Sequence, residues 1–204
     1  MVEKLLQGNR EFQGKFCREN AELMGKLARG QSPKTLFIGC SDSRVVPELI
    51  TSCLPGDIFV TRNIANIVGK GSNCVDAIVE YAVNHLKVGN IIVCGHYGCG
   101  GMAGLCKLGH LEKNLQDWLR PSLEAKEKLD SAIKEKGIEL NGDDYAKALV
   151  EANILLQLRN LRESEILAGK NVNLVGLVYD IESGRLFEGM EKLKELGVDG
   201  EIFS

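Results

Sequence analysis

The sequence predicts an α/β fold with a mostly parallel central sheet flanked by helices, and three observations support this prediction. Four short apolar runs are continuous rather than alternating, which is typical of parallel strands that helices cover on both faces. Helical patterns separate these runs, and alternating strands and helices indicate an α/β fold. Polar or glycine-rich segments follow several of the runs directly, where such sheets bind their ligands.

The elements follow in order along the chain. Two helices are expected over residues 2–29, before the first strand. The helix predicted over Ser72–Val88 has apolar residues at helical spacing on one face, with Ser72 as a candidate N-cap. The strongly charged segment 111–137 is expected to form surface helices. The four predicted strands are Leu36–Gly39, Ile58–Thr61, Asn90–Gly95 and Val172–Tyr179.

A second long helix is predicted over Asp143–Leu161. Its buried stripe is expected to include Ala148, Ala152, Leu155 and Leu158. With no internal repeat and no obvious linker, we expect one domain over residues 1–204, made of a helical arm (1–30) and an α/β core (31–204). A chain of this length can bury a substantial core without disulfides.

The composition excludes several classes of protein. The formal net charge is −3 without a basic block, which argues against a nucleic-acid partner. No apolar run is long enough to span a bilayer. The charged, amphipathic N-terminal segment lacks the apolar stretch of a signal peptide, so a cytoplasmic location is expected.

The cysteines do not suggest a disulfide framework, because their number is odd and the chain is expected to be intracellular. We expect Cys17 to be incidental on a helix, and Cys53, Cys74 and Cys106 to be packing residues. His110 is most simply a surface residue. The seven cysteines are Cys17, Cys40, Cys53, Cys74, Cys94, Cys99 and Cys106.

A metal constellation is indicated by the segment CGHYGCGG at 94–101, which follows a predicted strand. It places His96 and Cys99 three residues apart, and its glycines allow sharp turns. One imidazole and one thiolate suit zinc. Cys40 ends another predicted strand, so the three side chains converge on one point if the two strands are neighbours. Three ligands leave the fourth tetrahedral position open, as in catalytic zinc sites.

Two other interpretations of these cysteines are less favoured. A redox pair would need a Cys-x-x-Cys spacing, which the chain lacks. Cys94 could replace Cys99 as a ligand, but it lies inside an apolar strand and is more simply a core residue.

The residues after Cys40 suggest side chains that would assist the chemistry of such a metal. Zinc held by two thiolates and a neutral imidazole has no formal net charge, so it is a milder Lewis acid than a three-histidine site, whose bound water has a pKa of about 7. Asp42 can reach the metal or its water, and Arg44 can pair with that carboxylate and hold it away. The alternative is a surface salt bridge, with Ser43 or Asp42 capping the helix that follows.

With these residues in place, the chain resembles the β-class carbonic anhydrases from about residue 28 to 182. The family's motifs appear in order and at the family's spacing. They are CSDSR (40–44), RNIAN (62–66), EYAVNHLKV (80–88) and GHYGCGG (95–101).

The resemblance implies one zinc ion per subunit on Cys40, His96 and Cys99, with Asp42 and Arg44 as the family's Asp–Arg dyad. It implies reversible hydration of carbon dioxide to bicarbonate and a proton. In the family, zinc-bound hydroxide attacks carbon dioxide, and a proton must then pass to solvent.

The family's substrate pocket also maps onto this chain. Gln31 matches an amide donor to bicarbonate, and Gly100 matches the backbone position beside the last ligand. Phe59, Ile64 and Tyr81 match an apolar wall, part of which comes from the partner subunit. The resemblance therefore implies an obligate homodimer or a dimer-based oligomer, with the N-terminal helices packing on the partner.

The family has two subtypes, and one of them binds inhibitory bicarbonate in a second pocket built around a Trp, an Arg and a Tyr. Arg62 and Tyr179 match two of these positions, but Phe37 stands at the Trp position. The plant-like, non-allosteric subtype is favoured, with Asp42 paired to Arg44. His85 matches a proposed proton shuttle; a helix histidine without that role, or transfer to buffer, is the alternative.

Two other functions remain open at this point. Enzymes of the same fold that act on carbon disulfide or carbonyl sulfide keep the same zinc ligands and differ in pocket access. An inactive, zinc-stabilised binding protein is the second alternative, although a structural site would not need Gln31, Asp42 and Arg44.

Overall fold

The computed structural model describes residues 1–69 and 73–198, in two compact units, Met1–Ser32 and Pro33–Ser204. The N-terminal unit consists of α1 (Val2–Phe12), a π-helical turn (Gln13–Cys17) and α2 (Ala21–Leu27), which confirms the helices predicted there. Most apolar side chains of α1 are exposed, including Leu5 and Leu6. The single-domain assignment stays a prediction.

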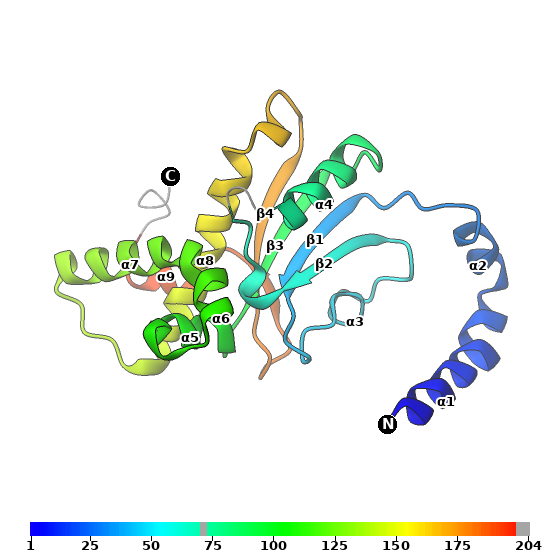
Figure 1. The fold of residues 1–204 in the computed structure, drawn as a ribbon, viewed down its shortest axis with the longest axis horizontal. Helices are drawn as coiled ribbons and strands as arrows, with labels where there is room; N and C mark the ends of the chain where they lie inside the picture. The colour runs from blue at the N-terminus through cyan, green and yellow to red at the C-terminus, as the bar shows by residue number, and fades with distance from the viewer. Residues whose placement is uncertain (70–72, 199–204) are drawn as a thin grey trace. The chain divides into compact units, whose positions relative to one another are not determined.

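The larger unit is built on a five-stranded sheet in the order β2-β1-β3-β4-β5 (Figure 1). The first four strands run parallel, as predicted, and β5 pairs antiparallel with β4. The sequence did not predict β5, because this strand is only three residues long and pairs with one other strand. Such a short edge strand leaves little apolar pattern in the sequence. The strands are β1 (Thr35–Cys40), β2 (Ile58–Asn63), β3 (Asn90–His96), β4 (Asn173–Tyr179) and β5 (Leu186–Glu188).

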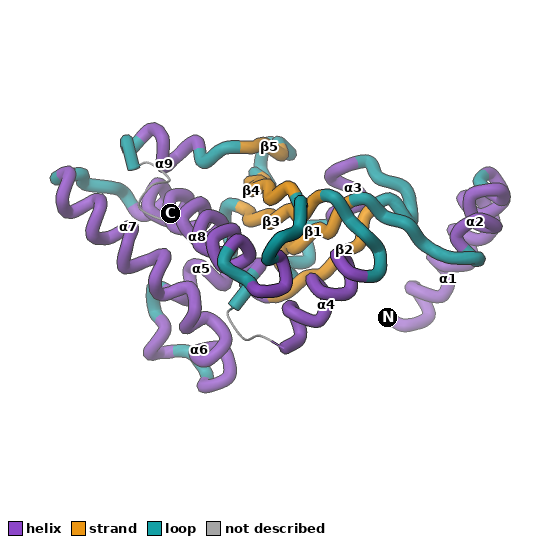
Figure 2. The backbone as a smooth tube through the Cα atoms, turned by 90° about the horizontal axis from the view of Figure 1, so that it is seen from above, coloured by secondary structure: helices purple, strands orange, loops and turns teal. Residues whose placement is uncertain are grey.

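Helices α4 (Asn73–Asn84) and α8 (Gly142–Arg162) lie along one face of this sheet (Figure 2), and their apolar side chains join those of the strands in the main core. Helix α4 ends before the predicted Val88. The helix ends there because Lys87 is left-handed (φ 56°) and the Val88 N–H turns back to the Ala82 carbonyl (3.1 Å). The predicted N-cap, Ser72, lies outside the described residues.

The opposite face of the sheet carries a smaller apolar cluster with Phe37, Cys94 and Tyr179 at its centre. A short helix, α3 (Pro47–Thr51), contributes Ile50 to this cluster. Helix cover is therefore unequal between the two faces within the larger unit, and several strand residues on this side are only half-buried.

Helix α8 (Gly142–Arg162) differs from its prediction. Instead of a single stripe, nearly every residue from 148 to 161 is buried, and only Leu155 and Arg159 are partly exposed. Four of the buried residues are polar: Glu151, Asn153, Gln157 and Asn160. Apolar periodicity could not predict this, since these side chains are buried through hydrogen bonds to particular partners.

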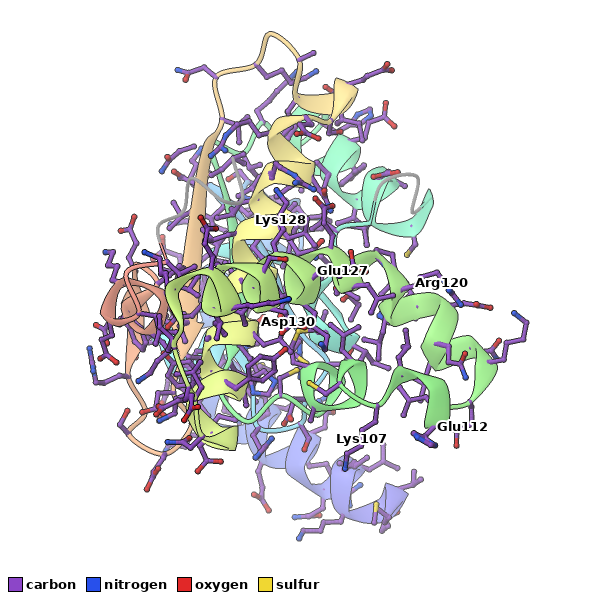
Figure 3. All side chains as sticks on the ribbon, turned by 90° about the vertical axis from the view of Figure 1, so that its left-hand side faces the viewer. Lys107, Glu112, Arg120, Glu127, Lys128 and Asp130 are labelled. Atoms are coloured by element: carbon purple, nitrogen blue, oxygen red, sulfur yellow. The ribbon has the colours of Figure 1, made fainter. Side chains whose placement is uncertain are left out.

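The charged segment forms surface helices, as predicted. α7 packs its buried Leu129 inward, while charged side chains of this region stand at the surface (Figure 3). None of the helices in the described ranges is long and apolar enough to cross a membrane. The remaining helices are α5 (Gly100–Leu105), α6 (Lys113–Leu119), α7 (Leu123–Lys136) and α9 (Glu191–Glu195). The labelled side chains are Lys107, Glu112, Arg120, Glu127, Lys128 and Asp130.

Strand β2 ends in a left-handed corner, Ile64–Asn66. Ala65 (φ 64°) and Asn66 (φ 48°) both adopt left-handed backbone, which is unfavourable for residues that carry a Cβ. The Asn63 side chain closes the corner, because its amide donates to the Ile67 carbonyl (2.9 Å) and its oxygen accepts from the Ile67 N–H (2.7 Å).

Candidate metal centre

Three side chains converge at the carboxyl ends of the two central strands. β1 ends at Cys40 and β3 ends at His96, and the strands are parallel neighbours, which confirms the condition on which the metal prediction depended. Gly98 turns the chain with a φ of 69°, and Cys99 then stands immediately before α5. Parallel strands bring their carboxyl ends to one edge, so residues far apart in the sequence meet there.

The ligand atoms of Cys40, His96 and Cys99 all lie within 4.8 Å of one another. The two sulfurs are 3.9 Å apart. Two sulfurs bound tetrahedrally at about 2.3 Å from one zinc ion would be separated by about 3.8 Å, so the spacing fits zinc. All three side chains are buried, which suits metal ligands better than a chance cluster of surface residues.

The hydrogen bonds of His96 also fit a metal ligand. Its Nδ1 lies 3.0 Å from the Tyr97 carbonyl oxygen, which fixes Nδ1 as the protonated nitrogen. Its Nε2 is buried and has no hydrogen-bond partner among the described residues. A buried ring nitrogen without a partner is costly, and a metal ion between the two thiols would satisfy it.

The two thiols differ in acidity. They share a hydrogen bond, which lowers the pKa of Cys40 and raises the pKa of Cys99. The backbone N–H groups of Asp42 and Ala65 also lower the pKa of Cys40. One thiolate is therefore favoured even before a metal binds, and metal binding would deprotonate the second thiol.

Asp42 is held by Arg44 beside this cluster. The Arg44 Nε donates to Oδ1 (2.9 Å), Nη2 donates to Oδ2 (2.7 Å), and the Arg44 N–H donates to Oδ1 (3.0 Å). These hydrogen bonds hold the pKa of Asp42 below its usual range, so the carboxylate is charged. Its Oδ2 is 3.8 Å from His96 Nε2. The carboxylate thus lies near the metal centre but is oriented by the guanidinium.

Arg62 fixes the backbone that carries these groups. Its Nε donates to the Cys40 carbonyl (2.7 Å) and its Nη2 donates to the Asp42 carbonyl (2.5 Å). The sequence singled out Arg62 for its motif position and did not predict this contact. Two bonds from one guanidinium to alternate carbonyls hold the segment after β1 in one conformation.

A small cavity of about 250 Å³ lies against the centre. Cys40 and Asp42 line it, together with Ser41, Ile64, Gly100 and Gly101. A Cβ at Gly101 would lie 2.9 Å from Ile64 Cγ2 and 3.0 Å from Ala65 Cβ, so only glycine lets α5 approach the corner this closely.

The comparisons with known proteins agree with this geometry. A family model described as "Carbonic anhydrase" matches residues 35–186. Among solved structures, the β-carbonic anhydrase CcaA superposes with a TM-score of 0.84 and 36% identity, covering 91% of this chain and 86% of that one. The chain belongs to the β-class carbonic anhydrases. It is therefore a zinc-dependent lyase that interconverts carbon dioxide and bicarbonate.

Other relatives of this carbonic anhydrase give the same result. A carbonic anhydrase of Pseudomonas aeruginosa is 42% identical over 191 residues, which cover 89% of this chain and 84% of that protein. A structure of tetrameric β-carbonic anhydrases from Sordaria macrospora superposes with a TM-score of 0.83 and 34% identity, covering 92% of this chain and 95% of that one.

The structure places the expected pocket residues of this carbonic anhydrase in three locations. Ile64 and Gly100 line the cavity. Phe59 and Tyr81 contact each other (ring centroids 5.9 Å apart) and His85 stacks on Tyr81 (5.1 Å), and these three residues are not among those that line the cavity. Gln31 belongs to the N-terminal unit and is not placed relative to the metal centre.

The remaining cysteines of this carbonic anhydrase are all free. Cys94 is buried in the core, and burial raises its pKa to about 12, so it is a poor candidate for a ligand. The prediction that Cys74 and Cys106 are packing residues is wrong, because both are exposed, Cys74 in α4 and Cys106 in the turn after α5. Cys53 is half-buried, and His110 is exposed, as predicted.

Proposed function

We propose that this carbonic anhydrase hydrates carbon dioxide at a zinc ion held by Cys40, His96 and Cys99, with the fourth metal position left free for water or an anion. The observation that carries the proposal is the pairing of Asp42 with Arg44, which occupies both carboxylate oxygens. A carboxylate held in this way does not compete for the metal.

Each of these residues has a defined part. When bound, zinc supplies Lewis acidity that makes water a nucleophile near neutral pH. Cys40 and Cys99 act as thiolates, and His96 presents Nε2 because Nδ1 donates to the Tyr97 carbonyl. Asp42, charged and only able to accept hydrogen bonds, orients the attacking water; Arg44 holds Asp42 in place.

We further propose that the substrate lies in the small cavity beside Cys40, against Ile64 and the backbone at Gly100. Gln31 would donate its amide hydrogen to bicarbonate, as the family resemblance implies. Phe59 and Tyr81 do not line this chain's own cavity, so we assign them to the pocket of a partner subunit. His85 is exposed and stacked on Tyr81, which supports a role in passing the proton to solvent.

This assignment makes the enzyme a homodimer or a dimer-based oligomer. The tetrameric relatives from Sordaria macrospora are compatible with it. The exposed apolar residues of α1, among them Leu5 and Leu6, support packing of the N-terminal helices on a partner. The cytoplasmic location stays a prediction from the sequence.

We also favour the plant-like, non-allosteric subtype. Phe37 is buried against the apolar cluster that contains Tyr179, and Arg62 is engaged with the Cys40 and Asp42 carbonyls. Through these contacts Arg62 and Tyr179 serve the fold rather than a second pocket for bicarbonate. A structure above pH 8 with Asp42 on the metal would contradict this subtype.

The deciding experiment is stopped-flow hydration of carbon dioxide by zinc-replete protein. We expect activity at mildly alkaline pH in the wild type and its loss in Cys40→Ser and Asp42→Asn, while Cys53→Ser, at a half-buried cysteine outside the ligand cluster, stays active. An inactive wild type that hydrolyses carbonyl sulfide or carbon disulfide would favour that alternative reaction. An inactive wild type with bound zinc and neither reaction would favour a binding protein.

A further inference from the structure

Three buried amides on α8 form a continuous hydrogen-bonded row. The Gln157 Nε2 donates to the Asn153 Oδ1 (2.8 Å), and the Asn160 Nδ2 donates to the Gln157 Oε1 (3.3 Å). Their spacing of four and three residues places them on one helix face. Asn153 and Gln157 are 1% and 0% exposed, so this amide row needs partners at every polar atom.

The outward partners of the amide row lie in the segment that follows β2, apart from Ser122, whose Oγ donates to the Asn153 Oδ1 (2.8 Å). The Asn153 Nδ2 donates to the Ala65 carbonyl (3.0 Å). Around Val68, the N–H donates to the Gln157 Oε1 (2.8 Å) and the carbonyl accepts from the Asn160 Nδ2 (2.8 Å). The amide row therefore holds this backbone at three points.

This segment includes the left-handed corner at Ala65 and Asn66. Such backbone is unfavourable for residues with a Cβ and persists only where the surroundings determine it. The corner is thus a place where the loss of one support is expected to change the conformation, rather than only the stability.

The corner also touches the metal centre. The Ala65 backbone N–H is one of the groups that lower the pKa of the Cys40 thiol. The Ile64 side chain lines the cavity, and the corner lies against Gly101 with no room for a Cβ between them. A shift of the corner would therefore change this effect on the Cys40 thiol and displace a wall of the cavity.

We propose that Asn153, Gln157 and Asn160 are positioning residues for the metal centre, which hold the left-handed corner in place as a wall of the cavity beside Cys40. This inference rests on the proposed function, because it takes Cys40 as a ligand. An N–H hydrogen bond takes up part of a thiolate's negative charge. The sulfur then donates less charge to a metal, which offsets the mild Lewis acidity expected of a site with two thiolates.

The test uses Gln157→Met, which keeps the side-chain length but removes the acceptor of the Val68 N–H. In the cobalt-substituted protein we expect a shift of the near-ultraviolet charge-transfer band between thiolate and cobalt. In a chelator competition we expect zinc affinity to fall about tenfold. Leu129→Ala is the matched control: it removes a buried side chain from α7, and it should lower the unfolding temperature without changing the band.

A wild-type band and a zinc affinity within twofold, in a Gln157→Met protein with a lowered unfolding temperature, would overturn the proposal and make the amides purely structural. Asn153→Ala, which truncates the side chain that contacts Ala65, is the second variant should Gln157→Met fail to fold. A wild-type protein without any thiolate–cobalt band would instead refute the ligand assignment under the proposed function, so the two failures are distinguishable.

Discussion

Replacing Arg44 by alanine tests the arrangement that keeps the metal's fourth position free. The change removes both side-chain hydrogen bonds to Asp42 and a weaker contact to the Gly98 carbonyl (3.2 Å). The freed carboxylate lies 3.8 Å from His96 Nε2, so it can turn toward the metal and compete with water there. We expect hydration of carbon dioxide to fall while zinc remains bound.

The expected size follows from the hydrogen bonds that are lost. Hydrogen bonds to a charged partner contribute about 1.5–3 kcal/mol each. The Arg44 side chain is 52% exposed and that of Asp42 is 17% exposed, so solvent screening leaves about half of the strength of the two bonds. That loss corresponds to a fall in kcat/KM of roughly 10- to 150-fold.

The assay is stopped-flow hydration at pH 8 with the zinc content of each variant measured in parallel. Arg44→Lys keeps the charge but not the two-pronged geometry, and it should fall between wild type and Arg44→Ala. An Arg44→Ala enzyme with full zinc and activity within threefold of wild type would refute the reasoning, since the carboxylate would then need no restraint.

Three further predictions concern the metal and the packing around it. Cys99→Ser should lose activity, and elemental analysis should show that it has lost zinc. A chelator should lower the unfolding temperature of the wild type, because a ligand at about 1,000 times its Kd adds about 4 kcal/mol to the free energy of unfolding. Equal unfolding temperatures with and without zinc would contradict this. Tyr97→Phe removes the 2.6 Å hydrogen bond to buried Glu151 and should lower the free energy of unfolding in urea by about 1–3 kcal/mol; an unchanged urea midpoint would contradict this. Gly95→Ala would place a Cβ 2.8 Å from a side chain of α8 and should lower the free energy of unfolding by about 1–3 kcal/mol. Gly89→Ala, with open space around the added Cβ, should be tolerated. Equal urea midpoints for the two variants would show that the core around Gly95 rearranges to accept the methyl group.

The sheet and its metal cluster could be predicted because their signals are local. A continuous apolar run ending at Cys40, and another ending near His96, were enough to indicate neighbouring parallel strands and a shared edge. The bonded pair of Asp42 and Arg44 lies within a few residues of the first ligand, so spacing alone suggested the pairing.

Other features depend on contacts across the fold and left no apolar pattern. Asn153, Gln157 and Asn160 have a regular spacing on one helix face, and that spacing of polar residues within an apolar helix was the signal available. What it could not give was the partner, since the corner at Ala65 is 88 positions away from Asn153. The role of Arg62 as a backbone clamp was missed for the same reason.

The two thiols that would share a zinc ion are separated by 59 positions in the chain. Bringing them together closes a long loop, whose entropic cost precedes any metal contact. The complete set of ligands is therefore together only where β1 and β3 are paired. Once bound, zinc would fasten the ends of the two central strands to each other. Loss of zinc and separation of those strand ends should then be coupled, so exchange of the metal would report on opening of the middle of the sheet.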